Sequence, residues 1–187
     1  MGWIARRRGQ EIAERGGLIP SEHLSPLPPK PPSASVTDTV QLVMPSDANP
    51  LGTIFGGQVM AWIDAVAAMA AQRHCRQVMV TLSMDALEFK APILVGEYAV
   101  LRAVVNRAWT TSVEVEVSVD AEHPITGERR HSAEAFLTFV ALGANGRPTA
   151  VPPVDPQTPE EHARFAAAEV RRAARLAARQ AAKPPSI

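Results

Sequence analysis

Cysteine, aromatic side chains and net charge are all scarce in this chain, and each scarcity excludes a class of protein. Cys75 is the one cysteine, so the chain forms no internal disulfide and no thiolate metal cluster, which suits a reducing compartment. Nineteen basic residues balance nineteen acidic ones and only 5% of residues are aromatic, which argues against a nucleic-acid-binding surface. The five histidines are dispersed without companion ligands, so we also expect no metal.

Long apolar runs are missing as well. The longest, residues 60–71, contains Asp64 and falls short of the roughly 20 residues that a membrane-spanning helix needs. The first residues carry arginines, but no apolar segment follows them, so they do not resemble a secretory signal. We therefore expect a cytoplasmic protein that has neither a membrane nor a nucleic acid as its partner.

The length of 187 residues and the 46% hydrophobic content allow one sizeable core with tails. Prolines crowd the sequence before residue 35, where they remove backbone donors and prevent core formation, and a short helix near residues 4–15 is the only regular structure expected there. We predict a flexible proline-rich tail over residues 1–35, a folded domain over 36–150, and a linker with an Ala/Arg-rich helix over 151–187.

Hydrophobic patterning within the folded domain predicts an α+β fold. A nearly all-apolar helix is expected over residues 56–74, and valines alternate with polar residues over 113–119, as in a strand with one solvated face. The opposite face of such a sheet needs an apolar cover, which the long helix supplies. We therefore predict a five-stranded antiparallel sheet wrapped around one central helix, with strands over residues 37–44, 78–84, 98–106, 113–119 and 130–142.

The C-terminal segment carries the signals of a second helix. Thr158 is a suitable cap, Pro159 suits the first turn, and arginines follow near the other end, where they complement the helix dipole. Two interpretations stay open. The helix packs on the protein surface or on a neighbouring subunit, or its arginines contribute to binding phosphate.

Asp64 is the one charged side chain between Ala48 and Gln72, and it follows the glycine pair Gly56-Gly57. Burying a carboxylate costs several kcal/mol, so a buried aspartate persists mainly where its chemistry is needed. The first N–H groups of the helix have no intrahelical partner, lie at the positive end of its dipole and are left unshielded by glycine. Asp64 lies about 10 Å further along the same face. A general base and an oxyanion binder can thus share one cleft.

Residues 45–57, PSDANPLGTIFGG, with Met60 and Asp64 after them, resemble the signature of the hotdog-fold acyl-CoA thioesterases. Residues 88–97 are similar to that family's linker between strands two and three, and residues 109–113 to its turn into the next strand. The likeness covers residues 37–150. The first motif is specific, because an asparagine, a spaced glycine, a glycine pair and an aspartate at fixed offsets rarely coincide by chance.

The resemblance implies a hydrolase that splits fatty acyl-CoA into free acid and coenzyme A, with no metal and no organic cofactor. It implies a hotdog fold, a homodimer as the minimal active unit, and assembly into trimers of dimers. By position, Asp64 matches the catalytic carboxylate, Asn49 its partner from the opposite subunit, and Gly57 the residue whose N–H faces the thioester oxygen. The same motif assigns Gly56 and Phe55 to substrate binding.

Other residues are candidates for holding coenzyme A. Its phosphates require cations, and Lys90 and Arg107 lie near predicted strand ends where a ligand can be reached. Thr111 and Ser112 are candidates for contacts with the pantetheine or the phosphates. Each also has a plainer explanation, since most surface cations are only solvated and hydroxyl residues commonly begin strands.

Alternatives to the catalytic interpretation stay open. Asp64 is also consistent with a structural carboxylate at a dimer interface, and Asn49 with a residue that forms the turn before Pro50. A catalytic Asp64 either activates water or attacks the thioester directly to form a mixed anhydride. The main rival function is a hotdog module that binds or senses acyl-CoA without cleaving it. A hotdog hydratase needs a catalytic histidine, and His74 lies only at the far end of the helix.

Overall fold

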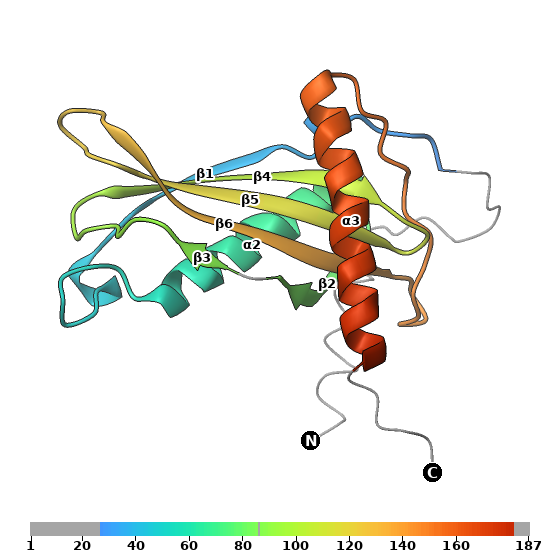
Figure 1. Ribbon diagram of the computed structural model, residues 1–187, viewed down its shortest axis with the longest axis horizontal. Coiled ribbons are helices and arrows are strands. Elements are labelled where there is room, and N and C mark those ends of the chain that lie inside the picture. The colour runs from blue at the N-terminus through green and yellow to red at the C-terminus, as the bar shows by residue number, and fades with distance from the viewer. Residues whose placement is uncertain (1–26, 86, 182–187) are drawn as a thin grey trace, which may run out of the picture.

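The chain folds into three layers with a β-sheet in the middle (Figure 1). A computed structural model describes residues 27–85 and 87–181. Helix α2 (Gly56–Cys75) packs against the five longer strands from one side, and helix α3 (Pro159–Ala181) crosses the other side. The arrangement confirms the α+β class, the curled antiparallel sheet around a central helix, and the separate C-terminal helix.

The sheet is antiparallel, in the order β1-β4-β5-β6-β2, and its five longer strands are those that patterning predicts. A sixth strand, β3, was not expected. It lies in the segment predicted as a linker, where Glu88 and Phe89 pair with Glu134 and Ala133 of β6. The strands are β1 (Thr37–Leu42), β2 (Val78–Met84), β3 (Glu88–Phe89), β4 (Tyr98–Ala108), β5 (Ser112–Glu122) and β6 (Arg129–Leu142).

Helix α2 buries one stripe of side chains and leaves the opposite stripe open. Val59, Ile63 and Val66, spaced three or four residues apart, are buried in the core against the sheet. Ala61 and Ala65, on the other side of the helix, are exposed, and Met60 and Met69, on its two flanks, remain 44% and 40% exposed. The sheet therefore covers α2 from one side only, and an apolar helix surface stays uncovered in the single chain. No helix in the described ranges has both the length and the apolar character to cross a membrane.

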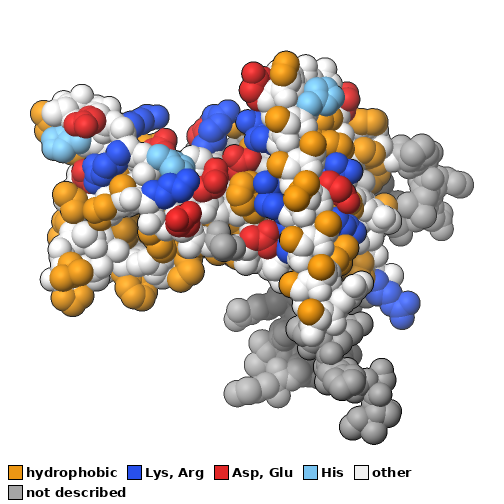
Figure 2. All heavy atoms as spheres, in the orientation of Figure 1, with side chains coloured by type: hydrophobic (Ala, Val, Ile, Leu, Met, Phe, Trp, Pro, Cys, Tyr) orange, Lys and Arg blue, Asp and Glu red, His pale blue; other side chains and the backbone are white. Residues whose placement is uncertain are grey.

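Helix α3 covers the sheet face that the sequence assigned to solvent. Glu114 of β5 is fully buried, and its carboxylate accepts hydrogen bonds from Arg171 at 2.6 Å and from Arg175 at 2.9 Å. Arg175 also donates to Asp85 at 2.6 Å. The prediction of a solvated face is therefore wrong at Glu114, where two arginines make burial of the carboxylate tolerable. Figure 2 shows the basic and acidic side chains gathered beside α3.

The last residues of the predicted flexible tail lie against the folded body. Lys30 forms a parallel bridge with Val154, and its N–H donates to the carbonyl of Pro153 at 2.9 Å. Ser35 is fully buried, and its hydroxyl oxygen accepts the N–H of Val105 at 2.9 Å. Hydrogen bonds to the body thus order this part of the segment despite its prolines. The rest of the tail, with the helix expected near residues 4–15, lies outside the described residues, and the domain boundaries stay a prediction.

The buried contact between Glu114 and α3 yields a prediction about stability. Glu114→Gln keeps the shape of the side chain but removes the charge that Arg171 and Arg175 share, so we expect the free energy of unfolding to fall by about 2 kcal/mol. The loss stays below that of a fully buried pair, because the side chains of Arg171 and Arg175 are 26% and 15% exposed. Urea denaturation followed by circular dichroism measures the change.

The matched control for this prediction is Glu122→Gln. Glu122 forms a surface ion pair with Arg129 at 2.6 Å, so its replacement should change the free energy of unfolding by less than about 0.5 kcal/mol. Equal losses in the two variants would contradict a special role for the contact between Glu114 and α3.

Candidate active site

Asp64 lies on α2 and is held by a hydroxyl from the neighbouring strand. The hydroxyl of Thr81 on β2 donates to Oδ1 of Asp64 at 2.7 Å. The register of β2 shifts directly after Thr81, between Thr81 and Ser83, and such bulges re-aim side chains near functional sites. The contact fixes one carboxylate oxygen and leaves Oδ2 for another partner. The sequence interpretation missed Thr81, because a lone threonine in an apolar strand gives no signal without the register.

The expectation that Asp64 is buried is not met in the single chain. Its side chain is half-buried and Thr81 is exposed. The reason is the one-sided cover of α2, since the sheet occupies the opposite side of the helix and leaves Asp64 at the border of the open side. The described residues therefore leave one side of Asp64 open to a further partner.

The start of α2 presents backbone donors without partners. Phe55 provides no side-chain cap, and its carbonyl accepts the N–H of Gln58 at 2.9 Å. Among the described residues, no acceptor takes the N–H of Gly56 or Gly57. A Cβ added to Gly57 would lie 2.3 Å from Cε1 of Phe55, so a side chain there would require the Phe55 ring to move. The glycine pair thus leaves two N–H groups open at the positive end of the helix dipole.

Asn49 organises the loop that leads into this helix start. Its Oδ1 accepts the N–H of Leu51 at 2.9 Å, and its Nδ2 donates to the hydroxyl of Thr53 at 2.8 Å. The loop then closes where the N–H of Phe55 donates to the carbonyl of Asp47 at 2.8 Å. The turn-forming role expected as the plainer alternative is therefore present. Within the described residues, no hydrogen bond joins Asn49 to Asp64.

A pocket of about 320 Å³ opens beside the start of α2 and brings Gly56 together with Lys90. The ring of Phe89 lies next to the helix start, since a Cβ on Gly56 would be 3.4 Å from it. The volume is that of a small-molecule site, and the lining is largely apolar with one cation. Figure 2 shows hydrophobic side chains gathered over this end of the molecule. The pocket is lined by Thr53, Ile54, Gly56, Phe89, Lys90, Ala91, Pro92 and Ile93.

Three of the candidate substrate-binding residues lie elsewhere. The guanidinium of Arg107 stacks on Phe165 of α3 at 4.0 Å and pairs with Glu169 at 3.1 Å, so α3 uses the charge that we assigned to phosphate. The carbonyl of Thr111 accepts a backbone hydrogen bond from Ala141 at 2.9 Å. Ser112 lines a second pocket, beneath α3. Within the described residues, none of the three makes a hydrogen bond to Asp64.

Cys75 and His74, at the far end of α2, are poor candidates for catalysis. Burial raises the pKa of the Cys75 thiol to about 12, so the reactive thiolate is scarce near neutral pH. Burial also lowers the pKa of His74, which is fully buried with Nε2 2.9 Å from the carbonyl of Pro152. Both side chains belong to the packing of the helix end.

Comparisons with known proteins agree on one family. The family model of the Thioesterase superfamily matches residues 51–128. The uncharacterized acyl-CoA thioester hydrolase YkhA of Bacillus subtilis is 48% identical over 119 residues, which cover 64% of this chain and 69% of YkhA. A hexameric acyl-CoA thioesterase of known structure superposes with a TM-score of 0.79 at 40% identity, over 84% of this chain and all of that one. The mammalian relatives, among them the rat cytosolic acyl coenzyme A thioester hydrolase, are longer, and the match spans 25 to 41% of their length.

The acyl-CoA hydrolase of Staphylococcus aureus, solved with butyryl coenzyme A and coenzyme A, has a TM-score of 0.75 at 35% identity, over 82% of this chain and 96% of that one. Three further structures of that enzyme carry alanine in place of an aspartate, an asparagine and a threonine. The asparagine precedes the aspartate by 15 positions and the threonine follows it by 17, which are the spacings of Asn49, Asp64 and Thr81. This chain therefore belongs to the hotdog-fold acyl-CoA thioester hydrolases of the Thioesterase superfamily.

Proposed function

We propose that the protein hydrolyses fatty acyl-CoA to the free acid and coenzyme A, with Asp64 as the general base and the start of α2 as the oxyanion site. The proposal depends on two features of α2. The carboxylate of Asp64 lies at the border of the open side of the helix, where Thr81 holds it. The first two N–H groups of the same helix have no acceptor among the described residues. A base and an oxyanion site, with no covalent nucleophile, are sufficient for a thioester.

The proposed reaction uses water as the nucleophile. Oδ2 of Asp64 takes a proton from a water molecule while the oxygen of that water forms a bond to the thioester carbon. The electron pair of the carbonyl double bond moves to the carbonyl oxygen. The N–H of Gly57 stabilises that oxyanion at the positive end of the helix dipole. Collapse of the intermediate breaks the carbon–sulfur bond, and the proton held by Asp64 goes to the leaving thiolate. Direct attack by Asp64 through a mixed anhydride stays the alternative, since the contact with Thr81 leaves Oδ2 available for either role.

The spacing along α2 supports a site shared by two copies. Asp64 lies about 10 Å from Gly57 along one helix, but a reacting carbonyl has to lie about 3 Å both from its oxyanion donor and from the attacking atom. A second copy that brings its own Asp64 to this helix start removes the mismatch. Asn49, which shapes the loop before Gly57, then belongs to the copy opposite the base, as the family resemblance implies.

The exposed apolar surface favours the same assembly. Strand β2 is an edge of the sheet, and Val78, Val80 and Leu82 along it are 50%, 41% and 50% exposed. These side chains alternate with Met79 and Thr81, which face α2, so they lie on the other face of the strand. An unpaired edge that carries exposed apolar side chains is suited to association with another copy. We propose a homodimer as the minimal active unit and a trimer of dimers as its larger assembly, supported by the hexameric relative.

The pocket beside α2 supports a fatty acyl-CoA substrate. Its walls include Ile54, Phe89 and Ile93, which suit an alkyl chain, and Lys90 supplies a cation for a phosphate. The name of the longer rat relative supports a cytoplasmic location. A module that only senses acyl-CoA is the rival function, and it predicts binding without release of thiol.

Removal of the base tests the proposed activity. Asp64→Asn is nearly isosteric, so we expect coenzyme A affinity to stay within about twofold while kcat falls by roughly 10²- to 10⁴-fold. Thiol release from a panel of short to long acyl-CoA substrates measures the rate, with Asp120→Asn as the surface control. Unchanged release by Asp64→Asn would exclude the base role, and no release by the wild-type protein from any substrate would favour the sensor.

The hydroxyl that holds Asp64 has its own test. Thr81→Val removes the donor to Oδ1, so the carboxylate loses its orientation and kcat should fall by about tenfold, with a smaller change in KM. Thr81→Ser keeps the donor and should retain most of the rate. Equal kinetics in the two variants would show that the contact plays no part in turnover.

Mixing two inactive variants tests the shared site. If each cleft takes Asp64 from one copy and Asn49 from the other, hybrids of Asp64→Asn and Asn49→Ala subunits contain some intact clefts and should regain up to about half of the activity per hybrid dimer. Differently tagged subunits isolate the hybrids before thiol release is measured. Hybrids that stay as inactive as their parents would place both residues in the same copy.

A further inference from the structure

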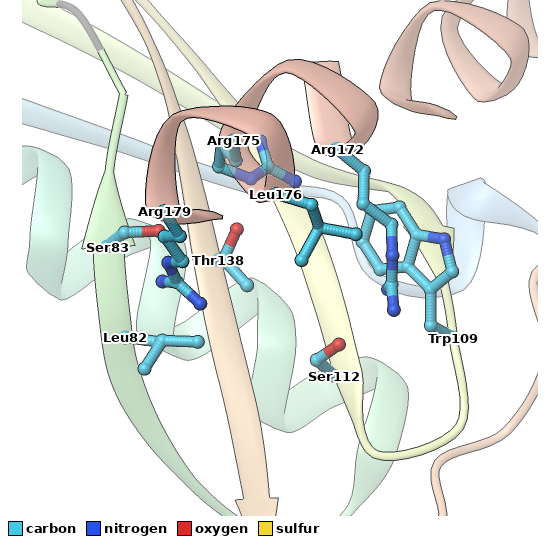
Figure 3. A pocket seen from close by; sticks show the side chains of 9 residues that line it. All are labelled: Leu82, Ser83, Trp109, Ser112, Thr138, Arg172, Arg175, Leu176 and Arg179. Carbon is cyan, nitrogen blue, oxygen red and sulfur yellow. The ribbon is translucent and has the colours of Figure 1, made fainter. Parts of the chain in front are cut away.

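A second pocket lies on the opposite side of the sheet from Asp64, beneath the C-terminal half of α3 (Figure 3). Its volume is about 110 Å³. Strands β2, β5 and β6 form its floor and α3 forms its roof. The pocket is lined by Leu82, Ser83, Trp109, Ser112, Thr138, Arg172, Arg175, Leu176 and Arg179.

The floor of this pocket holds buried hydroxyl groups without partners. Ser83 and Thr138 lie opposite each other in the register of β2 and β6, and both line the pocket. The oxygen of each hydroxyl is buried and makes no hydrogen bond within the described part of the chain. The Thr138 residue as a whole is only 7% exposed. An unsatisfied buried hydroxyl costs about 1–3 kcal/mol, so such a pair calls for an acceptor.

The roof of the pocket supplies positive charge that no carboxylate of the described residues neutralises. Arg171 forms an ion pair with Glu114, and Arg175 forms ion pairs with Glu114 and Asp85. Arg172 stacks on the ring of Trp109 at 4.4 Å. Within residues 27–85 and 87–181, neither Arg172 nor Arg179 has a carboxylate partner. Arg179 lies in the last turn of α3, where its charge is favourable for the helix dipole, but Arg172 lies two turns earlier and lacks this explanation.

We propose that this pocket binds a tetrahedral oxyanion of the phosphate class. Hydroxyl groups from the floor and the guanidinium groups of Arg172 and Arg179 from the roof line the same pocket, with Leu176 between the two arginines (Figure 3). Hydroxyl and guanidinium groups are suitable donors to phosphate oxygens. No carboxylate side chain lines the pocket to repel such an anion. The site is separate from the cleft at Asp64 and does not depend on the proposed thioesterase function. It also gives the arginines of α3 the phosphate-binding role that the sequence left open, beside their packing role.

Calorimetry and thermal shift with inorganic phosphate test the site on the full-length protein. Phosphate should bind the wild type and raise its Tm beyond the effect of sodium chloride at the same ionic strength. In the double variant Arg172→Gln with Arg179→Gln, the affinity should fall by about tenfold or more, because two charge-assisted contacts are lost. Arg164→Gln, on the same helix but outside the pocket lining, is the matched control. An effect of phosphate no larger than that of chloride, or equal affinity in the double variant, would overturn the proposal.

Thr138→Val separates binding from stability. The change removes the unsatisfied hydroxyl, so the variant should be as stable as the wild type or more so without phosphate, yet gain less Tm on its addition. A full phosphate-dependent gain in this variant would overturn the role of the hydroxyl floor.

A competition experiment identifies the source of the phosphoryl group. Coenzyme A carries a 3′-phosphate that dephospho-coenzyme A lacks. If coenzyme A displaces inorganic phosphate and dephospho-coenzyme A does not, the site binds the 3′-phosphate of the substrate, presented from a neighbouring copy. If phosphate binds and neither coenzyme A nor dephospho-coenzyme A displaces it, the site binds a free phosphate ion. Both results support the site.

Discussion

The one-sided cover of helix α2 is the constraint on which the rest of the structure depends. One stripe of the helix, which includes Val59, Ile63 and Val66, packs against the curled sheet, and the opposite stripe stays open. Asp64 stands at the border between the two, where Thr81 of the edge strand reaches it. Because the open stripe is apolar, the surface suited to association with another copy also carries the carboxylate. The proposed chemistry and the proposed assembly therefore share one face of the molecule.

The second face of the sheet is held to α3 by charge as well as by apolar contact, since Ala168 of α3 is fully buried and Phe165 packs against the core. Helix α3 is fixed to it by Glu114, a fully buried carboxylate shared by two arginines, and by the stacking of Arg107 on Phe165. These contacts engage the guanidinium of Arg107 with α3 within the single chain. They also leave a small pocket whose lining includes three arginines and no carboxylate. The two faces thus have different chemistry, with a thioester cleft proposed on one and an oxyanion site on the other.

Sequence patterns predicted most of the fold, because alternation and apolar spacing show which residues share a face. The long strands and the helix after the glycine pair follow from such patterns. Alternation does not show what covers a face, so Glu114 was assigned to solvent although α3 buries it. For the same reason the sequence suggested a buried Asp64, whereas a single chain leaves it half-buried.

The candidate site was only partly readable, because its parts come from separate segments. Asn49, Gly57 and Asp64 lie in one stretch of sequence, and a motif can reveal them together. Thr81 reaches the same site through the pairing of β2 and a shift of register, which no local pattern encodes. Lys90 and Gly56 meet at a pocket because β3 pairs with β6, and the sequence did not predict that strand.

The most direct test of the account is a crystal structure of the assembled protein with coenzyme A bound. We expect the sulfur atom to lie in a crevice between two copies, with the carboxylate of Asp64 from one copy on one side and the N–H of Gly57 from the other copy facing it. A structure in which every Asp64 faces bulk solvent, with the sulfur bound elsewhere, would contradict the account.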